Sequence, residues 1–160
     1  MDHLQVDPNY CMKTPTLCAV LSGSTNAPWD LSALKQYAVT QFCPEVLDFY
    51  MDAYLYRREY ETYKDLPSCK QTEDEIHDKW ARIMALYIQS NALREINIPG
   101  NMRRCLLAAD AAAIDLKSPD LLMPAFNHMH EILRDIFLQW ASTISSTEPV
   151  FEIGACNITT

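Results

Sequence analysis

Hydrophobic side chains recur at helical spacing along most of this chain. Ile76, Trp80, Ile83 and Tyr87 follow one another at intervals of four, three and four residues, which places them on one face of a helix. The same spacing predicts a helix from about residue 125 to 143, with a buried stripe of Phe126, Met129, Leu133, Ile136, Phe137 and Trp140. No segment shows sustained alternation of apolar and polar residues. The pattern therefore predicts an all-α protein.

Helix starts are marked by side chains that can accept from free backbone N–H groups, or by proline, which has no N–H to satisfy. Asp30 is a suitable N-cap for a helix that ends near Phe42, and residues 72–75 have the form of a capping box. Further starts are predicted at Pro15, Pro44, Asn101, Ser118 and Pro124. We expect about seven to nine helices, packed as an orthogonal bundle.

The helix that follows Pro44 has an unusually wide apolar face. Two neighbouring stripes run along it: Leu47, Tyr50 and Tyr54 on one, and Val46, Phe49 and Ala53 on the other. A helix that is apolar over so much of its surface is expected at the centre of a bundle. Residues 94–100 combine β-branched residues with a proline and a glycine, which predicts an ordered loop between two later helices.

The length of 160 residues suits one domain with a single core. Residues 1–14 contain no helical periodicity and are predicted to be a flexible arm. Residues 15–145 carry the helical pattern and form the expected domain, while residues 146–160 lose the pattern and form a tail.

The formal net charge of −8 disfavours nucleic acid and anionic lipid as partners, because those polyanions are bound through Lys and Arg. A protein partner is expected instead. No run of apolar residues is long enough for a transmembrane segment, and the six cysteines form no ligand cluster. We expect a cytoplasmic monomer, with peripheral attachment to the inner face of the plasma membrane left open by Cys11 as a lipid acceptor.

Candidate chemistry is sparse. His128 and His130 lie two apart on a helix and so point in different directions, which disfavours a metal site. Three glycines cannot build a phosphate-binding loop of either common type, and no such string is present. We predict no metal, no cofactor and no intrinsic catalysis. An enzyme whose site escapes recognition remains an alternative class.

Three segments resemble motifs of the RGS family, the regulators of G-protein signalling. Residues 42–50, from Phe42 to Tyr50, match in residue type the family string F-S-E-E-N-I-L-F-W. The family's E-I-N-I/L loop appears literally at residues 95–98, after a long amphipathic helix. Residues 124–130 look like the helix that follows a proline in the family, and the stretch from Pro15 is similar to the start of filamentous-fungal RGS domains.

The resemblance implies an RGS fold and a heterotrimeric G-protein α subunit, in its GTP-bound or transition-state form, as the partner. Loops at one end of the family's bundle grip the switch segments of Gα and accelerate GTP hydrolysis by positioning alone. Carried over residue by residue, the resemblance assigns Gα binding to Cys43, Pro44, Glu45, Val46, Glu95, Asn97, Pro99 and Gly100.

Asn97 aligns with the family asparagine that reaches the switch glutamine, although an asparagine there can also simply close its own turn. Val46 replaces a second asparagine of the family. The Asp and Arg of the family's last core helix are also missing: one alignment puts Ile132 and Ile136 there, the other Trp140 and Ile144. A non-catalytic RGS-like scaffold is therefore the alternative to a GTPase activator.

Overall fold

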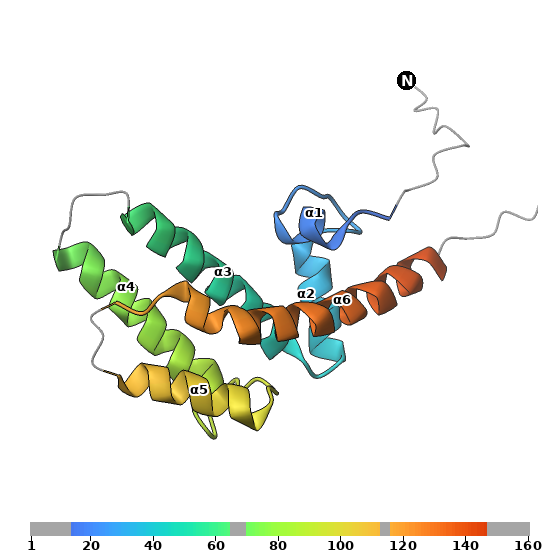
Figure 1. Ribbon diagram of the computed structural model, residues 1–160. Coiled ribbons are helices and arrows are strands. Elements are labelled where there is room, and N and C mark those ends of the chain that lie inside the picture. Colours follow the sequence, from blue (N-terminus) through green and yellow to red (C-terminus); the bar gives the residue numbers. More distant parts are fainter. Residues whose placement is uncertain (1–13, 65–69, 113–115, 147–160) are drawn as a thin grey trace, which may run out of the picture.

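The computed structural model describes residues 14–64, 70–112 and 116–146. These residues form six α-helices and no strand (Figure 1). The helices are α1 (Leu17–Leu21), α2 (Leu31–Thr40), α3 (Pro44–Lys64), α4 (Lys70–Ile83), α5 (Gly100–Ala111) and α6 (Met123–Ser146). A π-helical turn, η1 (Met84–Ile88), continues α4, and a 3-10 turn, η2 (Pro119–Leu122), leads into α6. The all-α expectation is confirmed, with six α-helices rather than the seven to nine expected.

Helix α3 lies at the centre of the bundle, as its wide apolar face predicts. It packs against α2, α4, η2 and α6, and in Figure 1 it runs behind the long α6 and beside α4. Val46, Phe49 and Ala53 are all buried, so this stripe faces the core. Tyr54 of the second stripe is 49% exposed, so the prediction that both stripes are buried along their length is wrong at this position.

The first two helices begin at side-chain caps. The side chain of Asp30 accepts from the backbone N–H of Ala33 at 2.9 Å, so the predicted N-cap of α2 is confirmed. At α1 the cap is Thr16, which accepts from the N–H of Ala19 at 3.2 Å. The prediction that Pro15 lies in the first turn of α1 is therefore wrong, because the threonine hydroxyl makes the capping bond one residue later.

Two predicted helix starts differ from the structure. Helix α4 already begins at Lys70, so residues 72–75 lie inside the helix and form no capping box. Helix α5 begins at Gly100 with Pro99 as its N-cap residue and no side-chain cap bond, so Asn101 is not a cap. In both places the helix begins one or two residues before the predicted cap. The backbone there continues the helix without a side-chain cap.

The last helix follows the sequence pattern closely. Ser118 caps η2 by accepting from the N–H of Asp120, and Pro124 lies in the first turn of α6, as predicted. The predicted stripe faces the core, with its first member, Phe126, half-buried and stacked on Tyr50. Helix α6 thereby supplies one wall of the core along its length.

Polar contacts join the outer helices to this core. The indole N–H of Trp80 donates to the carboxylate of Asp110 at 2.7 Å, which ties α4 to α5. Lys117 is 5% exposed and donates to the carbonyls of Ala109 and Ala112 at the end of α5. These bonds satisfy carbonyl groups that a helix C-terminus leaves without partners. The predicted arm and tail lie mainly outside the described residues.

Replacing Leu133 by Ala tests the packing of α6. Leu133 is fully buried in the core, so we expect the L133A variant to have a free energy of unfolding about 2–5 kcal/mol below that of the wild type. Leu138, on the same helix, is 58% exposed, and its replacement by Ala should change that free energy by no more than about 0.5 kcal/mol. Urea denaturation measures both. Equal losses in the two variants would contradict the placement of α6.

Candidate docking surface

The turn between α2 and α3 is a tightly hydrogen-bonded helix ending. The N–H of Phe42 donates to the carbonyl of Val39, and the N–H of Cys43 donates to the carbonyl of Ala38, both at 3.1 Å. This is the pattern of a Schellman motif, whose C′ residue takes the left-handed conformation. Phe42 occupies that position with φ of 57°. Glycine usually fills it, so Phe42 holds an unfavourable backbone conformation with its side chain 92% exposed.

The turn between η1 and α5, residues 89–99, is also ordered by backbone bonds. The N–H of Arg94 donates to the carbonyl of Leu86, and the N–H of Ile96 donates to that of Tyr87, both at 3.0 Å. Asn91 has φ of 64°, and its N–H donates to the Glu95 carboxylate at 2.7 Å. Ile96 and Ile98 are buried, so the turn is anchored to the core on one side.

Arg103 of α5 binds the backbone of this turn through its side chain. Its guanidinium donates to the carbonyl of Ile88 and, at 2.7 Å, to the carbonyl of Ile96. The same group lies 3.1 Å from the Glu95 carboxylate. A planar guanidinium suits this role, because its five donors have fixed directions. The backbone on both sides of residues 89–95 is therefore fixed by one side chain.

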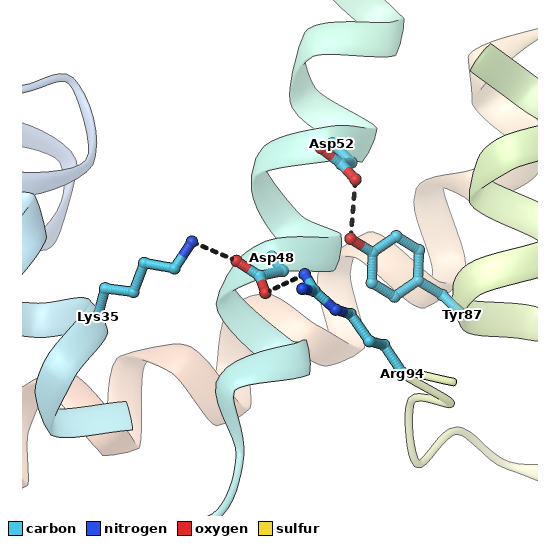
Figure 2. A network of polar contacts seen from close by, with 5 residues as sticks. All are labelled: Lys35, Asp48, Asp52, Tyr87 and Arg94. Atoms are coloured by element: carbon cyan, nitrogen blue, oxygen red, sulfur yellow. Dashed lines mark hydrogen bonds and ion pairs between the residues drawn. The ribbon is translucent and has the colours of Figure 1, made fainter. Parts of the chain in front are cut away.

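A single carboxylate of α3 connects α2 to the turn after η1 (Figure 2). Asp48, one turn into α3, accepts from Arg94 at 2.6 Å and pairs with Lys35 of α2 at 2.8 Å. Its side chain is only 14% exposed. Beside it the hydroxyl of Tyr87 donates to Asp52 at 2.7 Å, and burial together with this bond raises the pKa of Tyr87 above its ordinary value. The turns after α2 and η1 therefore lie at the same end of α3 (Figure 1).

The four site residues predicted on the first turn differ in their exposure. Cys43 is half-buried, and burial with the nearby charge of Glu45 raises the pKa of its thiol. Pro44 begins α3, and Glu45 lies half-buried in its first turn, where a carboxylate complements the helix dipole. Val46 is 5% exposed and belongs to the core, so its side chain is not on the surface of the turn.

The predicted residues of the second turn are all exposed, but they differ in their bonds. Glu95 is committed to Asn91 and Arg103. Asn97 is exposed, and among the described residues its side chain makes no hydrogen bond, so it does not close its own turn. Pro99 and Gly100 form the exposed start of α5. The structure thus brings the two predicted segments together and leaves one amide free.

Helix α6 does not supply the acidic and basic pair of the family pattern at either aligned position. Ile136 and Trp140 are buried, and Ile132 and Ile144 pack partly against the core. Elsewhere on α6 Glu131 and Arg134 pair at 3.2 Å, with both side chains more than half exposed. Both alignments therefore place core residues where the family has polar contacts.

Other kinds of site find little support in the described segments. No group of three or more His, Cys, Asp and Glu side chains there could hold a metal ion. None of the helices in those segments has the length and apolar character needed to cross a membrane.

Sequence reasoning missed the residues that shape the two turns. Asp48, Arg94 and Arg103 look like ordinary surface charges in the sequence, because their partners lie up to 46 residues away or are backbone carbonyls. One signal was available: Asp48 lies between Leu47 and Phe49, both expected in or near the core. A carboxylate in that setting needs partners.

A comparison with known protein families gives a match over most of the chain. The family model described as the regulator of G protein signaling domain matches residues 25–139, well over half of the chain. The chain belongs to the RGS family. The match contains the turns after α2 and η1 and the helices that carry them. A comparison with curated protein sequences found no match to this chain.

Membership in the family gives the two turns their context. An RGS domain regulates G-protein signalling and binds the Gα subunit, so this chain is a regulator of that pathway. Most of the residues that the resemblance places against Gα lie on or next to the two turns, whereas Val46 lies in the core.

Replacing Arg103 by Ala tests how the second turn is held. The change leaves the carbonyls of Ile88 and Ile96 without this donor, so we expect a loss of about 1–3 kcal/mol in the free energy of unfolding. Amide hydrogen exchange over residues 89–97 should become faster. The neighbouring Arg104, which is exposed and makes no side-chain bond among the described residues, provides the control in an R104A variant. Unchanged exchange in R103A would contradict the assigned role.

Proposed function

We propose that this RGS domain binds activated Gα through the turns after α2 and η1 and accelerates GTP hydrolysis on that subunit. One observation carries the proposal: the Asp48–Arg94 ion pair joins the first family motif segment to the residue that directly precedes the second, at one end of α3. The docking surface is defined here as residues 42–45 and 91–100. It is exposed over most of its second turn and anchored beneath by buried isoleucines.

Positioning is the mechanism that such a surface supports. Gα supplies the arginine, glutamine and magnesium of its own reaction, so an activator has only to hold the switch segments in their reactive shape. A rigid surface does this at a lower entropic cost than a mobile one. The bonds from Arg103 and the Schellman motif fix the backbone of both turns before any partner arrives.

Asn97 is the residue we assign to the switch glutamine. Its amide carries a donor and an acceptor, so it can orient a glutamine side chain through two complementary hydrogen bonds. The amide is exposed and has no bond to break among the described residues, so binding costs it no internal contact. Glu95 acts differently: its carboxylate shapes the turn through Asn91 and Arg103.

The first turn contributes Cys43, Pro44 and Glu45. Glu45 presents a carboxylate with no hydrogen bond or ion pair among the described residues, next to the strained Phe42. Val46 contributes nothing polar, because its side chain is buried in place of the family's asparagine. Activation by this domain should therefore depend more strongly on Asn97 than in a relative that has both amides.

Two departures from the family pattern favour the second candidate function, a scaffold that binds Gα without speeding hydrolysis. Val46 is buried, and the aligned positions of α6 carry core residues instead of an ion pair. For either function we propose a monomer that acts in the cytoplasm, at the inner face of the membrane where Gα lies. The filamentous-fungal origin that the resemblance suggests stays a prediction.

Single-turnover GTP hydrolysis by Gα separates the two functions. We expect the wild-type domain to raise the hydrolysis rate of its Gα and the Asn97→Ala variant to lose at least about tenfold of that acceleration. The Asn26→Ala variant changes an exposed asparagine in the loop after α1, away from both turns, and should behave as wild type (Figure 1).

Full acceleration by N97A would contradict the role of this amide. Binding of the wild-type domain to activated Gα with no change in hydrolysis rate would contradict activation and support the scaffold. Thermal melting of N97A and N26A should match wild type, because neither side chain is bonded in the described structure.

A further inference from the structure

The two most exposed large apolar side chains in the described residues lie on the docking surface. Phe42 is 92% exposed and Leu93 is 87% exposed, whereas the next most exposed large apolar residue, Leu138, reaches 58%. One of the two lies on each turn. Neither contributes to the core, so the fold itself does not explain why they are apolar.

The backbone at Phe42 is strained, and the turn at Leu93 is of a kind in which an exposed apolar residue is unusual. Phe42 is held at φ of 57°, where a side chain with a Cβ is strained and glycine would be relaxed. Leu93 occupies a turn closed by the bond from the N–H of Glu95 to the carbonyl of Ala92, a place where polar residues and glycine are usual. Strain of this kind is concentrated at functional sites.

We propose that Phe42 and Leu93 are apolar anchor residues that bury their side chains against the switch surface of activated Gα. This inference rests on the proposed function. Anchors that fill pockets near the centre of an interface supply most of its affinity. Here they replace polar contacts that this chain lacks, because Val46 is buried and α6 carries no ion pair at the aligned positions.

We assign Gα as the partner of these two side chains because they adjoin the residues already proposed to bind it. Phe42 directly precedes Cys43, and Leu93 lies two residues before Glu95. Arg94, the neighbour of Leu93, is fixed on Asp48, so the position of Leu93 is set by the same ion pair that joins the turns. A partner that binds across both turns has both apolar side chains within the segments that it covers.

Equilibrium binding of the full chain to Gα loaded with GDP and aluminium fluoride tests the proposal. We expect Phe42→Gly and Leu93→Ser each to weaken binding by about tenfold or more. F42G should also melt at a higher temperature than wild type, since glycine relieves the positive φ. Weaker binding by a more stable variant cannot come from unfolding. The control is Tyr54→Ala, an aromatic that is 49% exposed on α3 and lies outside the docking surface, which should bind within about twofold of wild type.

The outcomes separate this inference from the function on which it rests. If wild type binds and N97A binds more weakly, while F42G and L93S bind within about twofold of wild type, the anchors are refuted and the docking surface stands. If wild type binds no Gα in this form, both the docking surface and the anchors are refuted. Loss in Y54A equal to that in F42G would also overturn the assignment, because exposure alone would then explain it.

Discussion

The docking surface depends on one partly buried carboxylate shared between two cations. Asp48 projects from the first turns of α3 and meets Lys35 from α2 and Arg94 from the turn after η1 (Figure 2). Exposed ion pairs contribute little to stability. The carboxylate is 14% exposed, however, so removing either partner would leave a poorly hydrated charge. Helices α2 and α3 and the later turn after η1 are thereby held in one arrangement, which a surface that acts by positioning requires.

The division of labour within the second turn follows from this arrangement. Arg103 satisfies the carbonyls of Ile88 and Ile96, and Glu95 satisfies the N–H of Asn91, so the backbone needs nothing from Asn97. The amide is left for a partner. The first turn differs. Its hydrogen bonds place Phe42 in an unfavourable backbone conformation, and the Phe42 side chain does not pack in the core. In both turns the backbone is ordered by internal bonds, while an exposed side chain, Phe42 in the first and Asn97 in the second, remains available to a partner.

The sequence predicted the helices better than their ends, and the motif segments better than the contacts between them. Apolar periodicity predicted α3 and α6, because the spacing that places a stripe of residues on one helix face can be read within the segment alone. The capping box at residues 72–75 and the cap at Asn101 failed because a helix can begin one or two residues earlier whenever the backbone allows it. The Asp48–Arg94 pair could not be predicted, since a contact across 46 residues depends on how the helices pack. The burial of Val46 could be predicted, because Val46 lies in the same apolar stripe as Phe49 and Ala53. The family motif instead assigned Val46 to contact with Gα.

The most direct test compares binding of the full chain to one Gα in three states: with GDP, with GDP and aluminium fluoride, and with a non-hydrolysable GTP analogue. A surface shaped to hold the switch segments as they are during hydrolysis should bind the aluminium fluoride form most tightly, because that form mimics the transition state. Equal affinity for all three forms, or a preference for the GDP form, would contradict the account.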